Sequence, residues 1–276
     1  MLENNPLRQY FRRPSIYFKL PSGGRGYPPG IVNIPENGEL PVYPMTAIDE
    51  MTVRTPDGLF NGDAINSLIK SCIPAVLEPW KLSTFDVDAC IIAIKAAADN
   101  GKMEITTECP ACSEDTKFDI NLMPLLNEIS PLDYNEILKI GDLDIKFKSI
   151  MYADTNEMNL LQFQIQKTLY SLDQITEDSD QKQQIMTDAI KQMNDLVLRM
   201  VSKSIEYIQT PETKVTDLAF IQDFLSNCER STNALIKDTS VRLREKNEMK
   251  PLDVTCPHCK HQYKQKVVLN ATDFFD

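Results

Sequence analysis

Two copies of the pattern Cys-Pro-X-Cys are the clearest chemical signal in this sequence: Cys109-Pro-Ala-Cys112 and Cys256-Pro-His-Cys259. Two thiolates separated by two residues let one tight turn present both sulfurs to a single ion, and two such turns complete a tetrahedron. We therefore predict that Cys109, Cys112, Cys256 and Cys259 hold one zinc ion. A rubredoxin-like iron site uses the same four ligands and stays open. Four protein ligands fill the coordination shell, so the predicted site is structural and not catalytic.

The segments around the two cysteine pairs also resemble each other. EITTECPACSEDTKFDINL and PLDVTCPHCKHQYKQKVVL are each typical of a strand, a cysteine turn and a second strand, which predicts two β-hairpins. One hairpin alone is marginally stable, and a shared ion explains why there are two. Residues 102–119 have a net charge of −3 and residues 250–266 a net charge of +3, so we expect charge attraction to help bring the hairpins together.

The histidine content limits the catalytic sites that the chain could form, because it has only His258 and His261. A Ser-His-Asp triad, a Cys-His pair or an HExxH zinc site would each need one of these two neighbours. The sequence therefore predicts a protein that is not an enzyme. The remaining cysteines, Cys72, Cys90 and Cys228, lie in helix-like apolar patterns, and we expect them to be small buried hydrophobic residues.

The composition is that of a globular chain of one or two domains: 276 residues, 42% hydrophobic and 25% charged. A formal net charge of −11 disfavours binding of nucleic acid or anionic membranes by the whole surface. The N-terminal residues do not resemble a secretory signal, and no apolar run approaches the length of a bilayer. We expect no membrane association and a reducing, cytoplasmic setting, where cysteines favour metal over disulfides.

Residues 1–45 are rich in proline, glycine and aromatic residues, which predicts an extended arm lying on a protein surface. The first 30 residues carry a net charge of +4 and the rest of the chain about −15. An acidic surface, of this chain or of a neighbour, is therefore the expected docking site. Arginine and aromatic side chains are favoured at the centres of interfaces. The candidate partner-binding residues are Arg8, Tyr10, Phe11, Arg12, Arg13, Tyr17 and Phe18. Stacking on single-stranded nucleic acid is a less favoured use of the same residues.

The predicted fold class is α+β, with an N-terminal extended arm, a small helical unit, zinc-ribbon-like paired β-hairpins and a mainly α-helical insertion. Residues 1–45 form the predicted arm. Residues 46–125 together with 250–276 form a mixed α/β zinc-ribbon module, and residues 126–249 form the insertion. Such a long insertion between the two halves of a ribbon is tolerated because the entropy of loop closure rises only logarithmically with length.

Within the predicted insertion, alternating apolar residues around Gly141-Asp142 predict a hairpin over residues 137–148. Asp154 and Glu157 resemble a capping box that opens a helix. Apolar residues at helical spacing then predict a long helix over residues 181–208, with a helical stripe resuming after Pro211.

A resemblance to a known family lies in residues 7–27, LRQYFRRPSIYFKLPSGGRGY, and in residues 36–64, ENGELPVYPMTAIDEMTVRTPDGLFNGDA, followed by the CPAC turn. These runs resemble baseplate proteins of T-even-like contractile-tailed bacteriophages, which are small subunits associated with the baseplate hub or its assembly. The resemblance is most specific over residues 7–65 and continues to about residue 125.

This resemblance implies a baseplate hub subunit, present in the virion tail and in the host cytoplasm during assembly. The implied partners are other baseplate hub proteins, with self-association also open. Two alternatives remain. The chain is an assembly chaperone that is absent from the mature virion, or it is a zinc-ribbon nucleic-acid-binding protein whose basic second turn contacts phosphates. The basic residues in question are Lys260, Lys264 and Lys266.

Overall fold

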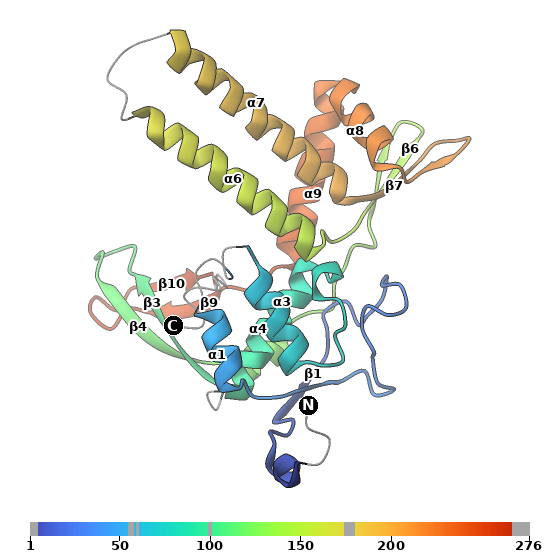
Figure 1. The fold of residues 1–276 in the computed structure, drawn as a ribbon. Coiled ribbons are helices and arrows are strands. Elements are labelled where there is room, and N and C mark those ends of the chain that lie inside the picture. Colours follow the sequence, from blue (N-terminus) through green and yellow to red (C-terminus); the bar gives the residue numbers. More distant parts are fainter. Residues whose placement is uncertain (1–4, 55–57, 59–60, 99–100, 174–179, 267–276) are drawn as a thin grey trace. The chain divides into compact units, whose positions relative to one another are not determined.

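The chain divides into two compact units in a computed structural model (Figure 1). The structure describes residues 5–54, 58, 61–98, 101–173 and 180–266. Unit 1 comprises Met1–Pro131 and Met249–Asp276, and unit 2 comprises Leu132–Glu248. Both units combine helices with small antiparallel sheets, which confirms the predicted mixture of α and β structure. In the part of the chain that the structure describes, no helix is both long and apolar enough to span a bilayer.

Unit 1 is organised around one helix that is buried on most sides. Its elements in chain order are η1 (Pro6–Tyr10), β1 (Ile16–Phe18), β2 (Leu40–Val42), α1 (Ala47–Val53), α3 (Asp63–Cys72), η2 (Pro79–Lys81), α4 (Thr84–Ala98), β3 (Lys102–Glu108), β4 (Asp115–Asn121), α5 (Leu122–Glu128), β9 (Leu252–Thr255) and β10 (Gln262–Gln265). Helix α4 is apolar around its circumference, as a central helix must be. It contacts β1, β2, β3, α3 and α5, and it begins where the hydroxyl of Ser83 accepts a hydrogen bond from the Asp86 N–H.

The N-terminal segment lies on unit 1 and pairs with it. Strand β1 runs antiparallel to β2, with Tyr17 opposite Pro41. Phe18 at the end of β1 is only 4% exposed. The turn after β1 contains Gly23 and Gly24 at positive φ, a conformation that glycine adopts without steric cost.

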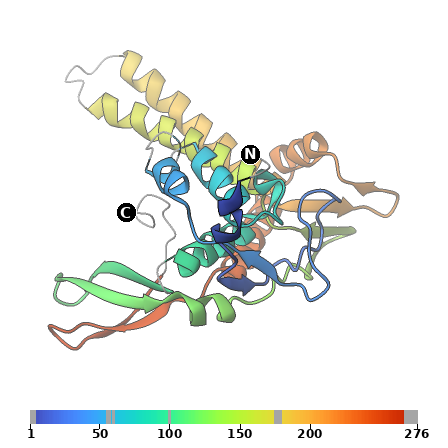
Figure 2. The same cartoon turned by 60° about the horizontal axis from the view of Figure 1, so that its bottom comes forward.

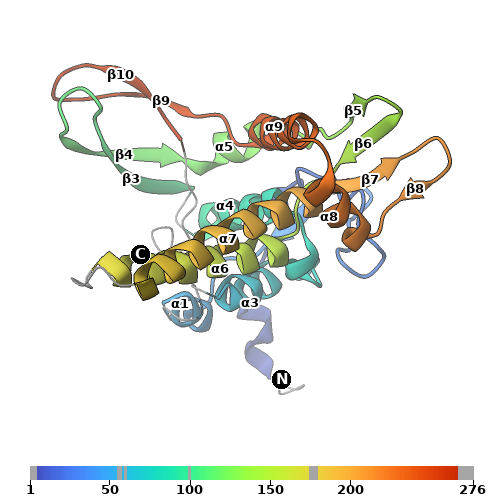
Figure 3. The same cartoon turned by 90° about the horizontal axis from the view of Figure 1, so that it is seen from above.

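Unit 2 combines helices with a four-stranded antiparallel sheet of order β5-β6-β7-β8 (Figure 3). Its elements are β5 (Ile137–Ile140), β6 (Leu143–Phe147), α6 (Tyr152–Asp173), α7 (Asp180–Lys203), β7 (Ile205–Gln209), β8 (Lys214–Val215), α8 (Leu218–Asn227) and α9 (Arg230–Asn247). Its buried core draws on the sheet and on α8 and α9. The core residues are Ile145, Phe147, Ile205, Ile208, Ile221, Leu225, Ile236 and Leu243. The hairpin predicted around Gly141 is confirmed as β5–β6.

The predicted helix over residues 181–208 is wrong at its C-terminal end, because α7 ends at Lys203 and Ile208 belongs to strand β7. The cause is a β-bulge where β7 pairs with β6, at the register shift between Lys146 and Phe147. A bulge inserts one extra residue into a strand. Ile205 and Ile208 therefore both reach the core although they are three residues apart, a spacing that otherwise indicates a helix.

The predicted capping box at Asp154 and Glu157 is also wrong, because α6 already begins at Tyr152. Both carboxylates instead bind the ammonium group of Lys203 at the end of α7, at 2.5 Å and 3.3 Å. These ion pairs hold the first turns of α6 against the last turn of α7.

Candidate metal centre

The two predicted cysteine hairpins are present in unit 1 and lie side by side (Figure 2). Strand β3 pairs with β4 up to Glu108 opposite Asp115, and β9 pairs with β10 up to Thr255 opposite Gln262. Each hairpin therefore ends in a six-residue turn that contains one cysteine pair. The longer hairpin is β3–β4, with seven paired residues on each strand against four in β9–β10.

The two turns have the same backbone hydrogen bonds. In each, the N–H of the first cysteine donates to the carbonyl five residues later, and the N–H four residues later donates back to the carbonyl of that cysteine. The distances are 3.1 and 2.8 Å in the first turn and 2.9 and 2.9 Å in the second. The residue after each second cysteine has positive φ, +54° at Ser113 and +62° at Lys260. Two sequences 147 residues apart thus fold into one repeated local structure.

The four cysteine sulfurs of the two turns come together at one point. The Sγ atoms of Cys109 and Cys259 are 3.7 Å apart, as are those of Cys112 and Cys256. All four Sγ atoms lie within 4.8 Å of one another. A tetrahedral site with metal–sulfur bonds of about 2.3 Å has sulfur–sulfur edges of about 3.8 Å, whereas a disulfide bond measures about 2.05 Å. The sulfur positions therefore fit a single tetrahedral ion.

The burial of the residue and the electrostatics of the thiol differ from one cysteine to the next. Cys109 and Cys256 are fully buried, Cys112 is partly buried and Cys259 is exposed. The backbone N–H of Cys259, followed by that of His258, lowers the pKa of Cys256 to about 6 against the opposing effect of burial. The backbone N–H of Glu114 favours the Cys112 thiolate, but burial and the other three sulfurs raise its pKa to about 12. A cation bound here would supply the positive charge that four adjacent thiolates require.

Uncharged side chains join the two hairpins beneath the sulfurs. The hydroxyl groups of Thr107 on β3 and Tyr263 on β10 share a hydrogen bond. Thr107 is buried, as are Thr116 on β4 and Val254 on β9. Because side chains alternate between the faces of a strand, the charged residues between these positions fall on the outer faces. The ion pair seen on these strands joins Lys117 of β4 to Glu104 of β3 within one hairpin, and the expected charge attraction between the hairpins stays a prediction.

Both histidines are exposed on the second turn and lie outside the sulfur cluster. The ring of His261 stacks on that of Tyr263, with centroids 6.2 Å apart. In the described structure, the four cysteines alone provide the donors of this site.

Lys260 in the second turn has a left-handed backbone conformation, with φ of +62°, and substituting it tests the geometry of this turn. We expect Lys260→Gly to stabilise the module by about 1 kcal/mol, because a left-handed conformation costs a residue with a Cβ about 1–2 kcal/mol and costs glycine little. The matched control is Lys264→Gly, an exposed lysine in strand β10, where glycine is expected to cost about 0.5–1 kcal/mol. Thermal unfolding of the two variants should therefore shift in opposite directions.

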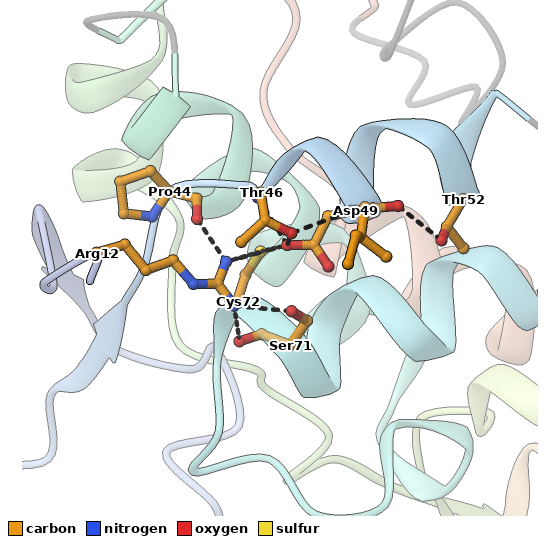
Figure 4. Close-up of polar contacts among 8 residues, drawn as sticks. Arg12, Pro44, Thr46, Asp49, Thr52, Ser71 and Cys72 are labelled. Atoms are coloured by element: carbon orange, nitrogen blue, oxygen red, sulfur yellow. Dashed lines mark hydrogen bonds and ion pairs between the residues drawn. The ribbon is translucent and has the colours of Figure 1, made fainter. Parts of the chain in front are cut away.

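A second polar site ties the N-terminal segment to unit 1 through Arg12 (Figure 4). Its guanidinium donates to the carbonyl of Pro44 at 2.5 Å and to Asp49 Oδ2 at 3.0 Å. It also donates to the carbonyl and hydroxyl oxygens of Ser71, at 2.9 and 2.8 Å. Cys72 Sγ lies 3.6 Å away. Arg12 was a candidate for partner binding on the sequence alone, and the structure shows it engaged within its own chain.

The other arm candidates divide into internal and exposed side chains. Phe18 is buried, whereas Tyr10, Phe11 and Tyr17 are 77%, 51% and 57% exposed. Arg13 is exposed as well. The side chain of Arg8 lies outside the described residues.

Two acidic residues in this region, Asp49 and Asp86, were not among the candidate site residues from the sequence. Asp49 accepts from both the N–H and the hydroxyl of Thr46, each at 2.8 Å, and pairs with Arg12. Thr46 and Asp49 form the capping box of α1. Their spacing of three residues is a local signal from which the role of Asp49 could have been predicted. Asp86 is fully buried and accepts from the Ser22 N–H at 2.9 Å and from the Tyr27 hydroxyl. Burial raises the pKa of Asp86, and no local pattern predicts its partners.

One family of known proteins matches this chain. The family described as "T4 bacteriophage base plate protein" matches residues 16–276. The match covers most of both units and includes all four clustered cysteines, but it begins after η1 and Arg12. Neither a curated protein nor a solved structure matches the chain.

Proposed function

Because this chain belongs to the T4 bacteriophage base plate protein family, we propose that it is a structural subunit of the baseplate hub that acts through protein contacts and without catalysis. Membership of this family implies contacts with other baseplate proteins and a location in the phage tail. The family match over both units is the observation on which the proposal depends. The proposed organisation is an arm over residues 1–45, a zinc-ribbon module over 46–125 and 250–276, and an insertion over 126–249.

The proposed ion is zinc, held by Cys109, Cys112, Cys256 and Cys259. Four sulfur donors at the spacing of a tetrahedron support this assignment. With four protein ligands no position is left for water, so the ion joins the hairpins and activates nothing. Native mass spectrometry of the purified chain distinguishes zinc from iron by the mass of the bound ion. An absorption spectrum adds a second criterion, since zinc with four thiolates is colourless in visible light and ferric iron is not.

The proposed docking surface on the arm consists of its exposed side chains, Tyr10, Phe11, Arg13 and Tyr17. Arg12 and Phe18 position this surface from within unit 1. Deleting residues 1–25 would remove these internal contacts as well, so it would not isolate partner binding. Point substitutions of the exposed residues avoid that difficulty.

We expect the double variant Tyr10→Ala/Phe11→Ala to weaken association with other baseplate proteins at least tenfold, since interface aromatics often contribute more than 1 kcal/mol each. Its free energy of unfolding should stay within about 0.5 kcal/mol of the unmodified chain, because both side chains are exposed. Co-purification of the tagged chain from infected cells, quantified by mass spectrometry, measures the first effect, and denaturant unfolding measures the second. Undiminished co-purification would show that the arm is not a docking surface.

Mass spectrometry of purified phage particles tests the proposed role itself. A hub subunit should be present at a fixed stoichiometry with the other baseplate proteins. Absence from particles, together with association during assembly, would instead identify an assembly chaperone.

The nucleic-acid alternative has one supporting observation, which is that Lys260 and Lys264 are exposed on the second hairpin. Binding through phosphate contacts would fall steeply with salt concentration. A chain that is not retained on a nucleic-acid column at low salt does not have this function.

A further inference from the structure

The sulfur cluster has one exposed member, and its close contacts pair the cysteines across the hairpins. Cys259 is exposed, whereas Cys109 and Cys256 are fully buried. The Sγ of Cys259 lies 3.7 Å from that of Cys109, and the Sγ of Cys112 lies 3.7 Å from that of Cys256. In both contacts one sulfur comes from β3–β4 and the other from β9–β10. An oxidant that reaches the cluster therefore meets Cys259 first, with a sulfur of the opposite hairpin beside it.

We propose that peroxide converts this site into two disulfides that cross between the hairpins, Cys109–Cys259 and Cys112–Cys256, and that these bonds replace the ion as the joint of the module. This inference rests on the proposed metal site and concerns what becomes of the site under oxidation.

The chemistry balances with hydrogen peroxide as the only oxidant. The Cys259 thiolate attacks one peroxide oxygen, the O–O bond breaks, and Cys259 becomes a sulfenic acid while hydroxide takes up a proton and leaves as water. The Cys109 thiolate then attacks the sulfenic sulfur, which forms the S–S bond and expels a second water after protonation. A second peroxide oxidises Cys112 and Cys256 in the same way. Four thiolates thus become two disulfides, two peroxides become four waters, and the ion is released with no ligand left.

The hairpins have contacts besides the ion that keep the crossing sulfurs within reach while this happens. The hydrogen bond between Thr107 and Tyr263 joins β3 to β10 directly below the cluster. Val254 on β9 and Thr116 on β4 are buried as well. Each turn also keeps its own backbone hydrogen bonds. The sulfurs need to approach by less than about 2 Å to reach bonding distance.

Which cysteines form disulfides decides whether the two hairpins stay connected after the ion is lost. A disulfide within one turn, Cys109–Cys112 or Cys256–Cys259, would leave the hairpins unconnected. Crossing disulfides link residues about 150 positions apart and so restrict the unfolded chain strongly. A tail subunit that stays in a released particle leaves the reducing cytosol, where thiols are maintained, so a joint of this kind would persist outside the cell.

The test uses the purified, zinc-loaded full chain titrated with hydrogen peroxide. A chromogenic chelator measures released zinc, and mass spectrometry of unreduced proteolytic digests locates the disulfides. We expect complete zinc release at about two peroxides per ion and peptides that join Cys109 to Cys259 and Cys112 to Cys256. Cys72 and Cys90, both fully buried in unit 1, should remain as thiols. The matched control is Cys228→Ser, whose cysteine lies in unit 2 and which should give the same result.

Other outcomes would contradict the proposal in distinguishable ways. Disulfides within the turns, or a Cys259 sulfinic or sulfonic acid without a crossing disulfide, would overturn the oxidative pairing and leave the zinc site intact as an assignment. A chain that purifies well folded and without metal would overturn the metal site and this inference together.

Discussion

Replacing Cys109 with serine is expected to reduce bound metal from about one ion per chain to nearly none and to unfold the two-hairpin module. Cys109 is fully buried and its sulfur lies in the cluster, so its loss leaves three thiolates around an incomplete site. Binding of a structural zinc ion contributes about 10–16 kcal/mol in small zinc domains, as much as the whole stability of an ordinary domain. Metal analysis of the purified variant and far-UV circular dichroism measure the two effects.

The chain contains its own controls for this experiment. Cys90→Ser changes a cysteine of unit 1 that is equally buried but lies in α4, away from the cluster. Cys228→Ser changes a partly buried cysteine of unit 2. Both variants should keep the full metal content, although serine at position 90 costs some stability because it buries a hydroxyl. Equal metal content in all three variants would show that the clustered cysteines are not the ligands.

Replacing Arg12 with alanine is expected to destabilise unit 1 by about 2–3 kcal/mol, below the roughly 3–5 kcal/mol of a fully buried ion pair that loses one partner, because the Arg12 side chain is 25% exposed. The Asp49 side chain is only 9% exposed and would lose its positive partner. The carbonyl oxygens of Pro44 and Ser71 would lose hydrogen bonds at the same time. Arg12→Lys should recover only part of this loss, because an ammonium group cannot reproduce the planar fork that reaches three residues at once.

The adjacent arginine supplies the matched control. Arg13 is exposed, and Arg13→Ala should change the free energy of unfolding by no more than about 0.5 kcal/mol. Denaturant unfolding of the three variants gives the comparison. Equal effects of the two alanine substitutions would mean that the contacts of Arg12 add nothing to the stability of unit 1.

The effect of Arg12→Ala should also depend on pH. Burial acts to raise the pKa of Asp49, but hydrogen bonds from Thr46 and Ser71 and the charge of Arg12 outweigh it and lower the pKa. A carboxyl whose folded pKa lies below its unfolded value contributes stability at neutral pH and loses it as the pH falls through the folded value. The difference in stability between the unmodified chain and the variant should therefore shrink in acid.

Several features of this protein follow from short stretches of its sequence. The two Cys-Pro-X-Cys turns, their flanking strands and the β5–β6 hairpin at Gly141 each depend on residues within about twenty positions of one another. In such segments the turn residues and the alternation of side chains decide the structure. The four clustered cysteines could be chosen from seven for the same reason, because only two pairs have the spacing that one turn can present to an ion.

The tertiary structure alone decided where the side chains of the N-terminal segment go. Arg12 looked like a surface anchor, yet its partners Pro44, Asp49 and Ser71 come from positions 32 to 59 residues further along the chain. Asp86 likewise binds Ser22 and Tyr27 across about 60 residues. Nothing in a local pattern records such pairings, because they exist only once α1, α3 and α4 have packed together.

The boundary between α7 and β7 also depends on long-range pairing and not on the local sequence pattern. Ile205 and Ile208 have the spacing of a helix, and only pairing with β6 turns that spacing into a bulged strand. The charges of the two cysteine hairpins predicted attraction, and the structure adds an uncharged contact between them, the hydrogen bond of Thr107 with Tyr263. Neighbouring residues thus fix the local turns and the two cysteine pairs that come together in the cluster. Long-range packing decided the strand register, the partly buried ion pair and the exposed aromatic surface, since each depends on which distant segments meet.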